Sequence, residues 1–197
     1  MVAEMAKIPR KQAKTINLGI MYGMGVGKLS EQLDIPAEEA RELVKQYHAR
    51  VPFVKGLMTG VMNHLNDRKS SGSIHSLMGR KCRFNLWEPD TFGMNKALPY
   101  KEALEEYGPT TRLKRAFTYK ALNRLIQASA ADMTKKAMVD LYKAGHLPMI
   151  QIHDEVAMSV KDVDEAKDIA KIMELALPIE VPNRCDIEIG PSWGEAR

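Results

Sequence analysis

The sequence predicts an α+β fold, in which a mainly helical part is followed by a part with a small antiparallel sheet packed by helices. In the first half, apolar residues recur every three to four positions, for example at Leu57, Val61 and Leu65, which is the period of an amphipathic helix. Near the C-terminus, residues 148–152 and 156–160 are short, rich in apolar and β-branched residues, and separated by polar ones. That pattern predicts a β-hairpin.

The helices of the first half are delimited by proline and glycine. Residues 9–23 begin with a proline, which the first turn of a helix tolerates, and end with a glycine. Pro36 precedes a helix over residues 37–48, whose acidic residues come early and basic residues late, as the helix dipole favours. Residues 30–34 indicate a short helical turn, and a further helix is expected after Pro52.

The second half mixes strands and helices. Residues 73–77 and 81–84 predict two strands joined at residues 78–80, and residues 185–189 predict a final strand. The Pro, Gly and Asn content of residues 86–115 indicates a loop-rich insertion with a helix over residues 100–107. Amphipathic helices are expected over residues 118–144 and 162–175, the latter capped by acidic residues.

One face of the first helix carries a stripe of functional side chains. Arg10, Lys14, Leu18 and Tyr22 recur at every fourth position, and steps of four at about 100° per residue keep them on one slowly drifting face. Arginine and lysine bind phosphate oxygens, and tyrosine offers a flat stacking surface, so the stripe suits a nucleoside triphosphate. An amphipathic helix whose basic residues are only solvated fits the pattern equally well.

The reversal of the C-terminal hairpin carries His153, Asp154 and Glu155. Adjacent carboxylates repel each other, so a pair at a hairpin tip is easiest to explain if a cation binds there. Carboxylate oxygens are hard ligands of the kind that Mg²⁺ prefers. The alternative is an exposed polar turn without a ligand.

The long helix over residues 118–144 places two amides on one face. Asn123 and Gln127 are four residues apart, whereas Leu122, Leu125 and Ile126 give the helix a buried face. Amide side chains both donate and accept, so they can contact the minor-groove acceptors of any correctly formed base pair. Two ordinary solvent-facing amides are the alternative.

Composition narrows the class of protein. The 197 residues suffice for one domain with a sizeable core, and 29 Lys+Arg against 25 Asp+Glu give a net charge of +4 and a pI near 9.0. Basic residues lie early in the chain, at residues 80–83 and at residues 112–124, at the start of the helix with the two amides, whereas the stretch from Asp154 onward is mostly acidic. Such basic segments suit contact with a phosphate backbone. Cys82 and Cys185 have no zinc-type or disulfide-type spacing. The sequence has no leader and no long apolar run, so a cytoplasmic location is expected.

Taken together and in this order, the three motifs resemble those of family A DNA polymerases. The residues from Arg10 to Gly23 resemble the fingers O-helix, residues 120–132 resemble the helix that faces the template-primer minor groove, and His153-Asp154-Glu155 resembles palm motif C. Residues 186–193 are similar to the C-terminus of the family. The resemblance covers nearly the whole chain except residues 86–115. The sequence Lys-Ala-Leu-Asn at residues 120–123 suggests a phage replicative enzyme more than a repair enzyme.

The resemblance implies a division into fingers at residues 1–85, an insertion at residues 86–115 and a palm portion at residues 116–197. It implies template-directed nucleotidyl transfer from a dNTP to a primer 3′-hydroxyl with two Mg²⁺ ions. In that scheme Asp154 ligates metal and Glu155 orients the ligand shell. Arg10 and Lys14 neutralise the triphosphate, with Lys14 also placed to protonate the pyrophosphate, while Leu18 and Tyr22 lie at the nucleotide. Asn123, Gln127, His153 and Arg80 contact DNA.

The sequence also departs from the family pattern. The motif A aspartate, which belongs to a stretch resembling Asp-Tyr-Ser-Gln-Ile-Glu, is absent, and so is a thumb. We therefore expect a C-terminal polymerase portion that is inactive alone and needs a second polypeptide or an upstream region carrying motif A and the thumb. If the source is viral, it would act in the host cytoplasm. A non-catalytic subunit or remnant that binds primer-template is one alternative, and a helical interaction protein is another.

Overall fold

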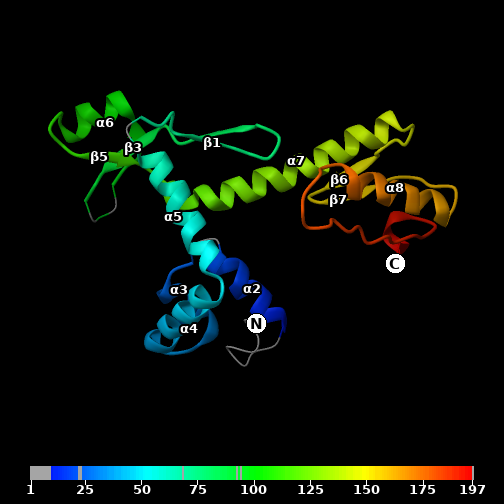
Figure 1. Ribbon diagram of the computed structural model, residues 1–197, viewed down its shortest axis with the longest axis horizontal. Coiled ribbons are helices and arrows are strands. Elements are labelled where there is room, and N and C mark those ends of the chain that lie inside the picture. The colour runs from blue at the N-terminus through cyan, green and yellow to red at the C-terminus, as the bar shows by residue number, and fades with distance from the viewer. Residues whose placement is uncertain (1–9, 22–23, 68, 92, 94, 197) are drawn as a thin grey trace. The chain divides into compact units, whose positions relative to one another are not determined.

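The computed structural model describes residues 10–21, 24–67, 69–91, 93 and 95–196, with the backbone alone at residues 10–12, 15 and 21. Within these ranges the chain forms α-helices and small antiparallel sheets, which confirms the predicted α+β class (Figure 1). It divides into two compact units. The first unit contains Met1–His75 and Lys81–Leu125, and the second contains Ser76–Arg80 and Ile126–Arg197. No helix of the described ranges has the length and apolar character needed to cross a bilayer.

Three helices of the first unit share an apolar cluster. The helices that begin this unit are α2 (Arg10–Met21), α3 (Val26–Leu33), α4 (Ala37–Arg50) and α5 (Pro52–Asn66). Ile16 of α2, Leu29 of α3 and Tyr47 of α4 are almost completely buried against one another, and α3 lies beside α4 in Figure 1. The helix α3 begins earlier than the turn predicted at residues 30–34, because burial of Leu29 stabilises an additional turn.

A second apolar cluster joins α5 to a hairpin and to the longest helix. The elements are β1 (Ser73–His75), β2 (Lys81–Arg83), the 3₁₀ turn η1 (Thr118–Lys120) and α7 (Ala121–Lys143). The strands β1 and β2 pair antiparallel, as predicted. Ile74 and Phe84 pack against Leu65 of α5 and Ala121 of α7. The start of α7 is therefore fixed by the core of the first unit.

Residues 86–115 contain more regular structure than the loop-rich segment that their composition indicates. They form β3 (Leu86–Pro89), β4 (Leu98–Pro99), α6 (Tyr100–Tyr107) and β5 (Leu113–Arg115), with the antiparallel strand order β4-β3-β5. The helix α6 agrees with the predicted one. Trp87 anchors the sheet, because the Arg115 guanidinium lies 4.5 Å from its ring centroid and the Tyr100 ring meets it edge-on at 5.0 Å.

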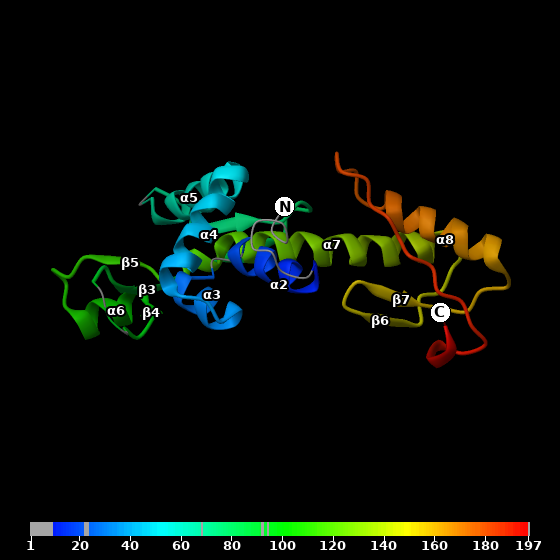
Figure 2. The same cartoon turned by 90° about the horizontal axis from the view of Figure 1, so that it is seen from below.

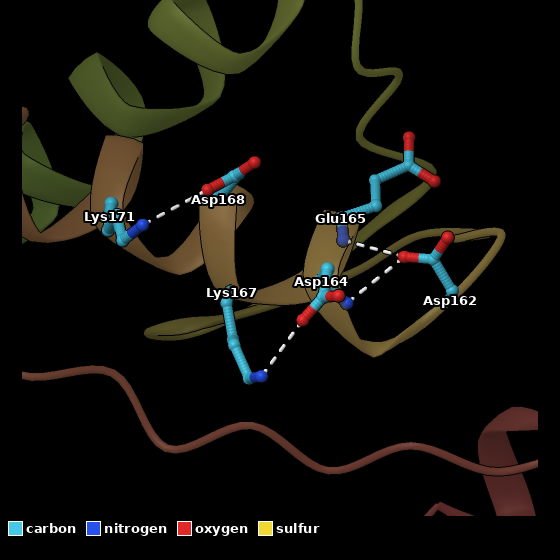
Figure 3. Close-up of polar contacts among 6 residues, drawn as sticks. All are labelled: Asp162, Asp164, Glu165, Lys167, Asp168 and Lys171. Atoms are coloured by element: carbon cyan, nitrogen blue, oxygen red, sulfur yellow. Dashed lines mark hydrogen bonds and ion pairs between the residues drawn. The ribbon is translucent and has the colours of Figure 1, made fainter.

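The second unit contains the predicted C-terminal hairpin and helix. These are β6 (Ile150–Ile152), β7 (Glu155–Ala157) and α8 (Val163–Leu175), followed by the 3₁₀ turn η2 (Trp193–Glu195) (Figure 2). The Asp162 carboxylate caps α8 by accepting hydrogen bonds from the backbone N–H groups of Asp164 and Glu165 at 3.0 and 2.9 Å (Figure 3). Figure 3 also shows the exposed ion pairs from Lys167 to Asp164 and from Lys171 to Asp168.

The final strand predicted at residues 185–189 is wrong, because this segment belongs to no sheet. The backbone N–H of Cys185 donates instead to the Glu174 carboxylate of α8 at 3.0 Å. The β-branched residues of the segment favour an extended backbone, but a strand also needs a partner strand for its ladder of hydrogen bonds.

Candidate active site and nucleic-acid contacts

The helix α2 has a buried and an exposed side. Ala13, Ile16 and Ile20 are buried at helical spacing, whereas Lys14 and Leu18 are exposed, Leu18 to 40%. The stripe predicted from the sequence therefore faces outward at these two positions. Arg10 begins the helix, but its side chain is not among the described ones, and Tyr22 lies outside the described residues.

The tip of the β6–β7 hairpin carries the imidazole and the two carboxylates. Ile152 pairs with Glu155, so His153 and Asp154 form a two-residue loop and Glu155 begins β7. His153 has φ of 55°, the left-handed conformation that tight hairpin loops require. The Gln151 amide donates to the His153 carbonyl and supports the turn. All three side chains are exposed, so a ligand can reach them.

The donors at this tip match magnesium in kind but not in number. Mg²⁺ prefers six oxygen ligands, and it commonly takes one or two carboxylates from the protein, with water and substrate phosphates completing its shell. Asp154 and Glu155 supply such carboxylates. Among the described residues, no group of three or more His, Cys, Asp or Glu side chains is arranged to hold a metal. The tip therefore carries carboxylates of the kind that Mg²⁺ takes from proteins, without forming such a group by itself.

The two amides of α7 differ in their surroundings. Gln127 is exposed, whereas Asn123 is half-buried, and the Oδ1 atom of Asn123 is buried without a hydrogen-bond partner in the described structure. A buried acceptor without a partner costs free energy, and a flip of the amide would exchange the positions of its acceptor oxygen and its donor NH₂ group. Asn123 thus retains unused hydrogen-bonding capacity near the exposed Gln127.

Arg80 is held by the helix α7. Its Nη2 donates to the Ala128 carbonyl at 2.7 Å and lies 2.8 Å from Oδ1 of Asp132. Asp132 is buried, and the Ser76 hydroxyl donates to its other oxygen. The backbone N–H of Leu77 donates to the Ser129 hydroxyl at 3.1 Å. The turn Ser76–Arg80 is consequently tied to α7 at several points.

Sequence reasoning singled out Arg80 but missed Ser76, Ser129 and Asp132. One signal was present: Ser129 and Asp132 occur on the helix side that also carries Leu125 and Ala128, and a charge on such a side requires a partner. Local sequence could not identify that partner, because Ser76 and Asp132 are separated by 56 positions.

The structure brings the sequence-predicted residues together in three groups. Lys14 and Leu18 share the exposed side of α2, Asn123 and Gln127 lie one turn apart on α7, and His153, Asp154 and Glu155 share the hairpin tip. The helix α2 belongs to the first unit and the hairpin to the second. The three groups offer cationic charge, hydrogen-bonding amides and carboxylate oxygens, respectively.

The model of the family "DNA polymerase family A" matches residues 1–195, and the chain belongs to this family.

Relatives and a solved structure agree with this assignment. The chain is 36% identical over 230 aligned residues to a DNA-directed DNA polymerase of Pseudomonas phage M6, an alignment that covers 100% of the chain and 31% of that relative. It is 30% identical over 196 residues to the thermostable DNA polymerase I of Thermus aquaticus, covering 95% of the chain and 21% of the relative. The POL domain of Pol1 from M. smegmatis, in complex with DNA primer-template and dNTP, superimposes with a TM-score of 0.68 at 25% identity, covering 92% of the chain and 31% of that domain.

The chain thus spans only about a fifth to a third of the length of these relatives. Its membership of the family is established by the match, whereas the activity of the complete polymerases is a matter for proposal.

Proposed function

We propose that this chain forms the fingers and the C-terminal palm portion of a DNA-dependent DNA polymerase. The observation that carries the proposal is the exposed carboxylate pair at the β6–β7 tip, in a His-Asp-Glu sequence that resembles the family's palm motif C. The reaction is attack of a primer 3′-hydroxyl on the α-phosphorus of a dNTP, with release of pyrophosphate. In this proposal residues 1–85 belong to the fingers, residues 86–115 are an insertion, and residues 116–197 belong to the palm.

The exposed side of α2 binds the incoming nucleotide. Lys14 is exposed and close to the N-terminal end of the helix, where a phosphate also meets the positive end of the helix dipole. In this proposal Arg10 is the second cation that binds the triphosphate, Leu18 lies beside the sugar, and Tyr22 stacks at the nascent base pair. Lys14 stabilises the charge that develops on the leaving pyrophosphate and is the candidate proton donor to it.

The hairpin tip supplies part of the ligand set for magnesium. Asp154 would ligate the ion, and Glu155, the first residue of β7, would orient the ligands around it. When bound, Mg²⁺ lowers the cost of charge on the attacking and leaving oxygens. His153 has the left-handed conformation at the same tip. In this proposal its imidazole contacts the primer terminus.

The face of α7 with Asn123 and Gln127 contacts the minor groove of the primer-template, where acceptors are present for every correct base pair. Arg80 adds a contact to the phosphate backbone. These contacts test the shape of the duplex and not its sequence. The phage relative supports action in the cytoplasm of an infected host cell.

The catalytic centre is completed by a second polypeptide or by an upstream region. Two-metal transfer places the ions about 4 Å apart and requires carboxylates from more than one segment. The described residues supply a carboxylate pair at one tip. The missing ligand and the thumb would come from the part that the longer relatives possess in addition.

Primer extension tests this proposal. The purified chain is assayed with Mg²⁺ and dNTPs alone, and together with a fragment of the Pseudomonas phage M6 polymerase that lacks the region matched by this chain. We expect extension only in the mixture, and loss of at least about a hundredfold with Asp154→Ala, since one oxygen ligand of the ions is removed. Asp168→Ala on the exposed side of α8 is the control. Extension within a few-fold of wild type for Asp154→Ala would refute the metal-site assignment.

A non-catalytic primer-template-binding role is the second candidate. It is favoured by the absence of a three-ligand group among the described residues. Under this alternative the chain binds primer-template with the affinity set by Asn123 and Gln127, and no complementary fragment confers extension.

A further inference from the structure

The guanidinium of Arg80 is clamped on one side and free on the other. Its side-chain contacts, to the Ala128 carbonyl and to the Asp132 carboxylate, are both made by Nη2. The Nη1 and Nε groups, which carry the remaining three N–H donors, have no partner in the described part of the chain. The side chain of Arg80 is 44% exposed, whereas that of Asp132 is 7% exposed. The guanidinium of Arg80 is therefore held in place by α7 and still offers N–H donors to solvent.

Asp132 can hold the guanidinium in one orientation because both of its carboxylate oxygens have partners. Oδ1 faces Arg80, and Oδ2 accepts a hydrogen bond from the Ser76 hydroxyl. The Ser76 hydroxyl in turn accepts from the backbone N–H of Arg80 at 3.0 Å, and the Ser76 N–H donates to the Arg80 carbonyl at 2.9 Å. The backbone and the side chain of Arg80 are thus held by the same small network.

This network is more elaborate than a structural tie between a turn and a helix requires. Apolar residues of similar volume often stabilise such a contact as well as a buried ion pair does, because burying charges costs desolvation. A held arginine, by contrast, loses less conformational entropy when it binds an anion, and its free N–H groups suit a phosphate oxygen. The half-exposed Arg80 has the arrangement expected of a pre-organised phosphate contact.

We propose that Asp132 is a positioning residue that orients Arg80 so that its free N–H groups bind a phosphate of the nucleic-acid backbone. This inference rests on the proposed function, because it takes primer-template DNA as the ligand. It adds a buried carboxylate of α7, with no contact of its own to DNA, to the residues that determine DNA affinity.

A double-mutant cycle on DNA binding tests the proposal. The dissociation constant of the full chain for a fluorescent primer-template duplex is measured by anisotropy at several salt concentrations for wild type, Arg80→Ala, Asp132→Asn and the double variant. We expect each single variant to weaken binding by roughly three- to tenfold and to reduce the salt slope by about one. The double variant should bind no more weakly than Arg80→Ala, because both changes remove the same phosphate contact.

Two further variants separate positioning from charge and from stability. Arg80→Lys keeps the charge but has no planar fork, so it should lose affinity as Arg80→Ala does. Asp140→Asn breaks the Lys136–Asp140 ion pair on the same helix and should leave the dissociation constant unchanged. Because Arg80 is half-exposed, its variants remain informative if Asp132→Asn fails to fold: full affinity in Arg80→Lys would overturn the positioning role.

The outcomes also distinguish this inference from the proposed function. Binding that weakens with Gln127→Ala but is indifferent to Asp132→Asn and Arg80→Lys overturns the inference alone. Failure of the wild-type chain to bind primer-template, both alone and with the complementary fragment, overturns the proposed function and the inference together.

Discussion

At the scale of the single residue, Leu18 gives the proposed nucleotide site an aliphatic side chain. Leu18 is exposed on α2 and has no hydroxyl to offer a nucleotide. In Leu18→Tyr the new hydroxyl replaces a polar contact that a dideoxynucleotide lacks, worth on the order of 1–3 kcal/mol. Dideoxynucleotide incorporation relative to the normal substrate should rise by roughly ten- to a hundredfold. The measurement uses the reconstituted enzyme, that is, the mixture of this chain with the complementary polymerase fragment. An unchanged ratio with intact activity would show that Leu18 does not face the sugar.

Lys14 yields a second prediction at the same scale. Lys14→Ala should lower the maximal rate of the reconstituted enzyme and weaken nucleotide binding, because a contact to charge that develops in the transition state is lost with a ground-state contact. Lys45→Ala is the matched control, since Lys45 is exposed on α4 of the same unit and makes only a 3.4 Å ion pair with Glu42. Rapid-quench kinetics give both quantities. Equal losses in the two variants would point to diffuse electrostatics and not to a defined site.

Individual residues were predictable from the sequence where their grouping is local. His153, Asp154 and Glu155 are consecutive, and Lys14 and Leu18 are related by one helical period, so neighbours in sequence become neighbours in space. The clamp on Arg80 was not predictable, because Asp132 reaches it only through the packing of a distant turn on α7. Local periodicity contains no information on such pairing.

At the scale of elements, the same distinction separates helices from strands. The helices α4, α5, α7 and α8 are close to their predicted ranges, because apolar periodicity and end signals are repeated over many residues. The strands β3 and β4 have four and two residues, and each ends in a proline, which argues against a strand in sequence reasoning. Their sheet exists because Trp87 packs with Arg115 and Tyr100, contacts that no local pattern reveals.

Arg115 should be the residue on which this small sheet depends. Its Nη1 donates to the Phe84 carbonyl at 2.8 Å, its guanidinium stacks on Trp87, and burial lowers its pKa below the usual value for arginine. A side chain at Gly72, whose φ is +67°, would meet this guanidinium. Arg115→Met should therefore destabilise the chain by about 1–3 kcal/mol, measured by urea unfolding. Arg112→Met, at a position with an 84% exposed side chain, should change stability by less than about 0.5 kcal/mol. Equal effects would remove the special role of Arg115.

At the scale of the whole molecule, apolar packing is unevenly distributed. Among the described residues, both apolar clusters lie in the first unit, one around Tyr47 and one around Leu65. The second unit buries fewer apolar side chains, most of them alanines besides Leu141 and Ile169, and is also held by helix capping, exposed ion pairs and the Arg80–Asp132 network. Exposed ion pairs each contribute little free energy, so local opening should be easier in the second unit than in the first.

Hydrogen exchange followed by mass spectrometry checks this difference. The amides of α8 and of the β6–β7 hairpin should exchange at least about tenfold faster than those of α4, because opening them exposes less buried apolar surface. Addition of the complementary polymerase fragment should slow exchange in the second unit more than in α4, since a partner that binds only the folded state stabilises it by mass action. Equal protection of α4 and α8 in the isolated chain would contradict the first expectation. Protection confined to α4 after the fragment is added would mean that the fragment engages the first unit and not the hairpin that carries Asp154.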